Sequence, residues 1–242
     1  MLLIADVELT SMGALLTQNP IDLGPLTAPI TLFASVGVIN AINMSDRIDG
    51  LSGVCVSISL GFIALLSFST GSFVTGSFCL VTICSMAAFL LQNFRRLWHK
   101  KALVYLGDAG STMLRFILAW LLISSTPGAP PSFEPVYALW FLAITLFDTV
   151  NLIINRPLRE NSTFSPGHDH LHHTLLTRGL SVKQVIFLIL FLSLLCGGIG
   201  LLGISLGASQ SLMFQIFIAV FSIYFLFSDR VSQKPATYVA QS

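Results

Sequence analysis

Charged side chains are scarce in this chain. Only 10% of its 242 residues are Asp, Glu, Lys or Arg, whereas 54% are hydrophobic, and the mean hydropathy is +0.84. A soluble domain carries about 25% charged residues, so the composition excludes an ordinary soluble protein. The formal net charge is +1, which gives no reason to expect a nucleic acid or another polyanion as partner.

Cysteine is sparse as well, and the positions of the four cysteines argue against disulfide bonds and metal sites. The four cysteines each lie inside an apolar run, with no CxxC pair, at Cys55, Cys79, Cys84 and Cys196. We therefore expect reduced core side chains, not disulfides or metal ligands. The residues after Met1 lack the basic segment and long apolar core of a signal peptide, so we do not expect one there.

Long apolar runs are what the chain has in abundance. A membrane-spanning helix needs roughly 20 mainly apolar residues. The sequence predicts an all-α, polytopic membrane protein, with residues 1–242 forming one integral membrane domain of about seven such helices. We interpret Thr10–Leu16 as a short interfacial helix. The spans are expected near Leu26–Met44, Leu51–Phe68, Phe73–Leu91, Ala109–Ser125, Val136–Ile154, Val185–Leu206 and Leu212–Phe227.

The basic residues lie on one side of this topology. All Lys and Arg residues except Arg115 fall in segments that alternating spans place on the same face: Asp46–Gly50, Gln92–Gly107, Asn155–Gln184 and the tail after Ser228. By the positive-inside rule this face is cytosolic. The five His residues lie there too, so we expect the chemistry at the cytosolic face, with a His-rich loop over residues 155–184.

The first of three polar islands is Asn40–Leu51, which reads Asn-Ala-Ile-Asn-Met-Ser-Asp-Arg-Ile-Asp-Gly-Leu. The run Leu26–Ile39 before it carries no charge. Ionisable groups are costly at bilayer depth, so a cluster at the end of an apolar span indicates a functional site. Asp46 and Asp49 share a face if the helix continues, and their oxygens suit a hard cation such as Mg²⁺. A polar loop with a helix cap is the alternative.

The second island is Val104–Thr112, in which Gly107 and Gly110 bracket Asp108 where a helix is expected to begin. Glycines let a ligand approach the backbone closely. A helix start offers free N–H groups to an anion, so Asp108 would hold a cation while the amides hold phosphate oxygens. A simple N-terminal cap followed by a Gly-Ser-Thr turn explains the same residues equally well.

The third island is Phe164–Thr174, whose titratable residues are His168, Asp169, His170, His172 and His173. This composition would allow a transition-metal site, but the spacing lacks the Cys partners or HExxH motif that indicate zinc. Imidazoles equally suit a substrate pyrophosphate or a proton relay. The flanking arginines favour anion recognition; they are Arg156, Arg159 and Arg178. A solvated polar loop is the alternative.

One further carboxylate, Asp148, lies inside an expected span, about two helical turns from Arg156. A buried carboxylate in a membrane helix should point into the bundle and find a partner. Structural pairing, for example with Arg115, and service in an active site are both consistent with this position. Arg115, itself inside a span, must either snorkel towards water or pair.

Together the islands resemble, in order and spacing, the polyprenyl-phosphate N-acetylhexosamine-1-phosphate transferases. The nearest type is the bacterial enzymes that use undecaprenyl phosphate and N-acetylglucosamine. The matching segments are Asn40–Leu51, Tyr105–Thr112 and Phe164–His173, and the resemblance extends from about Leu9 to Phe227. Each motif alone is weak, but three in this order on one membrane face are specific.

The resemblance implies a multi-pass enzyme of the bacterial inner membrane with a cytosolic active face and Mg²⁺, or Mn²⁺, as cofactor. Such an enzyme transfers N-acetylhexosamine 1-phosphate, here expected to be N-acetylglucosamine 1-phosphate, from a UDP-sugar to undecaprenyl phosphate. It releases UMP and initiates cell-envelope polysaccharide synthesis. Membrane lipids and a second copy of the chain are further expected partners.

The resemblance also assigns roles to individual residues. Asn43 and Asp108 would bind the metal. The catalytic residues would be Asp46, Asp49 and Asp108, and the substrate-binding residues would be Asn40, His168, His170, His172 and His173.

The sequence departs from the family pattern in several places. The family has an Asp-Asp pair on an earlier cytosolic loop, which this chain lacks, so the chain is expected to be N-terminally truncated relative to the family. Arg47 and Arg115 stand where the family has Gly, and His168 stands where it has Arg. The alternative interpretation is therefore a catalytically impaired member that binds nucleotide sugar without turnover. A transporter is disfavoured, because its polar groups would lie near mid-bilayer in two related halves.

Overall fold

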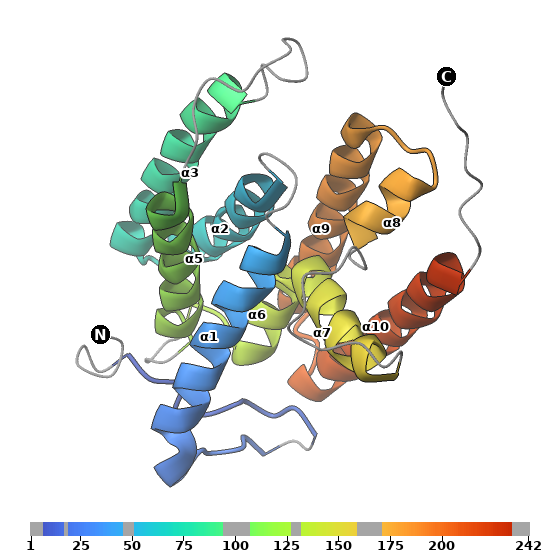
Figure 1. Ribbon diagram of the computed structural model, residues 1–242. Helices are drawn as coiled ribbons and strands as arrows, with labels where there is room; N and C mark the ends of the chain where they lie inside the picture. The colour runs from blue at the N-terminus through green and yellow to red at the C-terminus, as the bar shows by residue number, and fades with distance from the viewer. Residues whose placement is uncertain are drawn as a thin grey trace, which may run out of the picture.

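The computed structural model describes residues 7–16, 19–45, 51–93, 107–126, 132–158 and 171–233. Within these ranges the chain is helical apart from short connections and one isolated bridge between Ser11 and Asp22 (Figure 1), which confirms the all-α prediction. The helices are η2 (Gly24–Leu26), α1 (Thr27–Ser45), α2 (Leu51–Ser69), α3 (Phe73–Asn93), α5 (Gly107–Ser124), α6 (Pro135–Phe141), α7 (Ala143–Leu158), α8 (Leu171–Thr177), α9 (Val182–Ser205) and α10 (Gln210–Gln233).

Five of the described helical segments are long and apolar enough to cross a membrane, or up to six if the bent pair α6 and α7 counts as one span. The five are Gly24–Asn43, Leu51–Ser69, Phe73–Gln92, Val182–Ser205 and Gln210–Ser228. The expected span at Ala109–Ser125 is present as a shorter apolar helix, Ala109–Ser124. The chain is therefore a multi-pass helical membrane protein, whereas the count of seven is not confirmed.

The core of the bundle is apolar, but several helices also bury polar side chains and expose large apolar ones. On α1, Thr31 and Ser35 are buried at 0% and 4% exposure, while Phe33 is 80% exposed. On α7, Asp148 is buried whereas Ile153 is half-exposed. Polar groups inside and apolar groups outside are what a lipid environment requires, because lipid cannot satisfy hydrogen-bonding groups.

The prediction of one continuous span over Val136–Ile154 is wrong. Helices α6 and α7 meet at a bend of 84°, where Leu142 leaves the helical conformation with φ −107° and ψ 5°. Both helices pack on α9 and α10, and α7 additionally packs on α1 while α6 additionally packs on α2. At the break, the Ser59 hydroxyl of α2 donates to the Phe141 carbonyl at 2.7 Å. Broken membrane helices are tolerated where neighbouring side chains satisfy the backbone in this way.

Small residues allow the close packing of α9 against its neighbours. A Cβ added to Gly200 would lie 2.9 Å from the Cβ of Trp140 on α6, and one added to Gly203 would meet Met213 of α10. Glycine at such contacts lets membrane helices approach closely. The prediction of core cysteines holds for Cys55, Cys79 and Cys196, which are buried, and is wrong for Cys84, which is exposed on α3.

The interfacial helix predicted at Thr10–Leu16 is also wrong. This segment pairs with a later one, through the Met12 N–H donating to the Ile21 carbonyl at 3.0 Å and the Leu23 N–H donating to the Thr10 carbonyl at 2.9 Å. The Ala14 N–H donates to the Gln210 side chain at the start of α10, at 2.7 Å. These partners are distant in sequence, so local periodicity could not reveal them.

The hydroxyl at the bend gives a first prediction. Ser59→Ala should lower the free energy of unfolding by about 1–3 kcal/mol, because the Phe141 carbonyl then loses a buried donor. Ser57→Ala is the matched control, since the Ser57 hydroxyl donates only within its own helix, to Gly53 at 2.8 Å. Thermal unfolding in detergent measures the difference. Equal stability of the two variants would show that the bend does not depend on this bond.

Candidate functional site

The helix ends that flank the three islands lie on the same side of the molecule. In Figure 1 the C-terminal end of α1, the first residues of α2 and α5, helix α8 and the start of α9 all lie towards the top of the view. Helix α1 packs against both α5 and α2, and α8 packs against α9 and α10. The backbone therefore brings the ends of all three islands to one end of the bundle.

The first island begins on the last two turns of α1. Asn40 and Asn43 are both exposed there and, three residues apart, lie on one face of the helix. Helix α1 ends at Ser45, so both carboxamides lie near its C-terminal end. Asp46 and Asp49 lie outside the described residues, and their assignment as catalytic stays a prediction.

The second island coincides with the start of α5. Gly107 is the first residue of this helix and has φ +67°, a conformation that strongly favours glycine. Asp108 is its second residue; its side chain is outside the described part, so its predicted metal-binding and catalytic roles stay predictions. The first turn of an α-helix leaves its N–H groups without intrahelical partners, as expected for a phosphate site.

The third island ends in a short helix that was not expected inside the loop 155–184. Leu171 and Leu175 are buried, four residues apart on α8, and this pair packs the helix against the bundle. His172 and His173 are its second and third residues, but their side chains are not described, and His168 and His170 lie outside the described residues. The Leu171–Leu175 spacing was the signal that could have predicted α8.

The buried carboxylate of Asp148 holds α8 in place. Its Oδ1 accepts a hydrogen bond from the Leu171 N–H at 2.9 Å and one from the Tyr224 hydroxyl at 3.3 Å. Asp148 is 5% exposed, so α7, α8 and α10 meet at this oxygen. Of the two alternatives that the sequence left open, these bonds show a structural role for Asp148, and service in an active site stays a prediction. Arg115 of α5 is 7% exposed, which shows that it does not snorkel to the surface.

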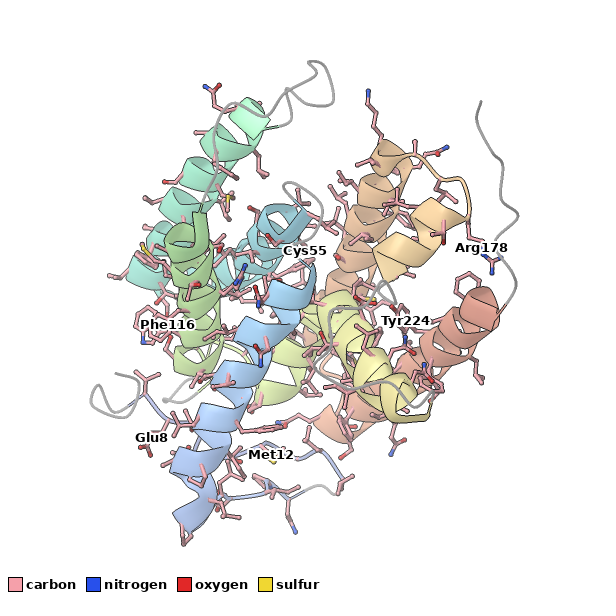
Figure 2. All side chains as sticks on the ribbon, viewed as in Figure 1. Glu8, Met12, Cys55, Phe116, Arg178 and Tyr224 are labelled. Carbon is pink, nitrogen blue, oxygen red and sulfur yellow. The ribbon has the colours of Figure 1, made fainter. Side chains whose placement is uncertain are left out.

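A cavity of about 20 Å³ next to Asp148 connects the first and third islands. Leu51, the last residue of the first island, and Leu171, which lies within the third island, both line this cavity together with Cys55. Cys55 of α2 and Tyr224 of α10, both labelled in Figure 2, lie on elements that contribute to the surroundings of Asp148. One residue of the first island and one of the third therefore line the same small buried cavity.

The described residues contain no cluster of three or more His, Cys, Asp or Glu side chains that could hold a metal ion. The oxygen donors that remain as candidates are Asn43 at the end of α1 and Asp108 at the start of α5. A carboxamide and a carboxylate suit a hard cation such as Mg²⁺, which is usually held by one or two protein oxygens plus substrate phosphates. Magnesium at these two residues stays a prediction.

The bundle and its one-sided polar ends define a polytopic membrane protein with a polar site at one membrane face. Residues 1–126 match the family described as "Glycosyl transferase family 4". The chain belongs to this family, as the resemblance of its motifs predicted.

Three curated relatives carry the name undecaprenyl-phosphate alpha-N-acetylglucosaminyl 1-phosphate transferase. The chain is 33% identical to the protein of Yersinia pestis and 32% identical to that of Escherichia coli strain K12, each over 93% of the chain and 61% of the relative. It is 35% identical to the protein of Haemophilus influenzae, over 91% of the chain and 62% of the relative. The chain therefore spans less than two thirds of the length of these relatives.

The conformation of Gly107 gives a second prediction. Gly107→Ala should lower the free energy of unfolding by about 1–2 kcal/mol, because an L-residue is strained in the left-handed region. A Cβ at this position meets no heavy atom within 4 Å, so no steric clash contributes. Gly61→Ala, equally open but within the helix α2, should be neutral or stabilising by up to about 1 kcal/mol. Chemical denaturation measures both, and a stabilised Gly107→Ala variant would contradict this conformation.

Proposed function

We propose that this protein transfers N-acetylglucosamine 1-phosphate from UDP-N-acetylglucosamine to undecaprenyl phosphate and releases UMP. The observation that carries the proposal is the identity of 33% over 93% of the chain, an alignment whose length takes in all three islands. The geometry supports it, because the helix ends that flank the islands lie at one end of the bundle. Initiation of cell-envelope polysaccharide synthesis is the corresponding proposed role.

The reaction needs a phosphate oxygen of the lipid to attack the phosphorus that bears the sugar. One P–O bond forms, and the P–O bond to UMP breaks. The protein's main task is therefore to align nucleophile and leaving group. The N–H groups in the first turn of α5 are suited to phosphate oxygens. Asp46 and Asp49 are proposed to bind the nucleotide sugar. Further contacts to its diphosphate or sugar are proposed from Asn40, His168, His170, His172 and His173.

Asn43 and Asp108 would hold Mg²⁺, for which Mn²⁺ is a chemically reasonable substitute. The proposal rests on the all-oxygen character of these donors and on the packing of α1 against α5. When bound, the cation would neutralise charge on the donor diphosphate and on the departing UMP.

The active face is proposed to be cytosolic, in the bacterial inner membrane. Arg178, directly after α8, and Lys183, at the start of α9, are both exposed at the end of the bundle where the islands lie. Positive charge on the short connections marks the cytosolic side. This orientation would present the site to a cytosolic nucleotide sugar.

Turnover gives a third prediction. In lipid nanodiscs with UDP-N-acetylglucosamine, undecaprenyl phosphate and Mg²⁺, the chain should form a lipid-linked sugar pyrophosphate. Asp108→Ala should reduce the rate by about 10²–10³-fold, since it removes a group that stabilises transition-state charge. Asp22→Ala is the control, because Asp22 is exposed before η2, at the opposite end of the bundle, and its rate should not change.

Two outcomes would contradict this assignment. An unchanged rate for Asp108→Ala would remove Asp108 from the site. Calorimetric binding of UDP-N-acetylglucosamine without any turnover would show a non-catalytic member of the family instead.

Metal removal gives a fourth prediction. Excess EDTA should abolish turnover, and Mg²⁺ or Mn²⁺ should restore it, because the proposed donors are all oxygen. Zn²⁺ should restore it poorly, since the proposed site has no sulfur or imidazole ligand. Full turnover in EDTA would refute the proposed metal site while leaving the transferase activity in place.

A further inference from the structure

We infer that Asp148 is a positioning residue of the nucleotide-sugar site, which acts by fixing the start of α8 and with it the histidine segment. This inference rests on the proposed function. The histidines of the third island either precede α8 directly or belong to its first turn. Whatever holds the start of α8 therefore also holds the backbone at His172 and His173, its second and third residues.

The hydrogen bond from Leu171 is what links Asp148 to α8. Helix α8 has seven residues, which is too short for a helix to be stable without tertiary contacts. Its first N–H has no intrahelical acceptor, and the Asp148 carboxylate supplies one at 2.9 Å in a buried setting.

Helix α10 in turn orients the carboxylate. The Tyr224 hydroxyl donates to the same Oδ1 at 3.3 Å, and the Tyr224 ring packs on Phe147 with ring centroids 5.6 Å apart. Phe147 directly precedes Asp148 on α7. The carboxylate is therefore held from both sides in a position where it can accept from α8.

A polar link between α7 and α10 would not by itself require a carboxylate at position 148. One turn further along α7, the buried Asn151 side chain donates to the Ser228 hydroxyl of α10 at 3.1 Å. That neutral pair already provides a polar link between the two helices. Asp148 additionally bonds α8, and burying a carboxylate is costly unless it is hydrogen-bonded.

The same carboxylate lies beside the end of the first island. Asp148, Leu51 and Leu171 line one cavity of about 20 Å³. A change at Asp148 should therefore disturb the groups proposed to bind the nucleotide sugar. The binding of the lipid phosphate should be affected much less.

The test compares Asp148→Ala, Asp148→Asn and Asn151→Ala in the full chain in nanodiscs. Deuterium exchange is measured on peptides covering α8, and KM is measured separately for UDP-N-acetylglucosamine and undecaprenyl phosphate. Asp148→Ala should speed α8 exchange and raise the KM for the nucleotide sugar, each by about tenfold, with the KM for the lipid unchanged. Asp148→Asn retains an acceptor oxygen, so the α8 exchange rate and the KM for the nucleotide sugar should each change by only about threefold.

Asn151→Ala is the matched control, because it breaks a buried bond between α7 and α10 without touching α8. It should leave α8 exchange and both KM values as in the wild type. If Asp148→Ala does not fold, the intermediate values of Asp148→Asn carry the test, and wild-type values for Asp148→Asn would overturn the inference.

Equal effects of Asp148→Ala and Asn151→Ala would reduce Asp148 to a packing role and overturn the inference. If the wild type turns over UDP-N-acetylglucosamine and Asp148→Ala keeps its KM, the positioning role alone fails. If the wild type neither binds nor turns over the nucleotide sugar, the proposed function fails and takes this inference with it.

Discussion

The need to satisfy buried polar groups inside a bundle with an apolar outer surface governs this structure. Lipid offers no hydrogen-bond partners, so each polar side chain of a span needs one from within the protein. The Ser59 hydroxyl bonds the Phe141 carbonyl, Asn151 bonds Ser228, and Asp148 bonds the first N–H of α8. These contacts fix the bend between α6 and α7 and the position of α8, so the same constraint that stabilises the fold also positions the site.

The candidate site is built from helix ends and not from a preformed cage of ligands. Helix α1 ends next to its exposed carboxamides, α5 begins at Gly107 with φ +67°, and α8 begins at Leu171 on the Asp148 carboxylate. Such an arrangement places the exposed polar groups of the described helix ends at one membrane face. A hard cation held partly by substrate phosphates needs few protein ligands, which agrees with the small number of donors on the described helices.

The pattern of apolar runs in the sequence was enough to predict the positions of most helices. The starts of the helices at Leu51 and Phe73 were predicted from apolar runs, and the structure agrees; the span expected from Ala109 belongs to a helix that begins at Gly107. The bend at Leu142 could not be predicted, because neither proline nor glycine marks it and the hydroxyl that bonds the Phe141 carbonyl there comes from Ser59, 82 positions away in sequence. The partner of Asp148 was equally hidden, since the Leu171 N–H lies 23 positions away in sequence. Of the predicted site residues, Asn40 and Asn43 are placed as exposed side chains, while the roles of all of them remain predictions.

The central claim is that the oxygen donors of α1 and α5 meet at one face, and a cross-link tests it most directly. In a background without the four native cysteines, Asn43→Cys and Asp108→Cys are combined and treated with a short bis-maleimide. The account predicts that this pair cross-links efficiently and that UDP-N-acetylglucosamine with Mg²⁺ slows the reaction. The control pair, Asn43→Cys with Gly207→Cys, should give no cross-link, because Gly207 lies between α9 and α10 at the other end of the bundle. Absence of the first cross-link, or equal yields for both pairs, would contradict it.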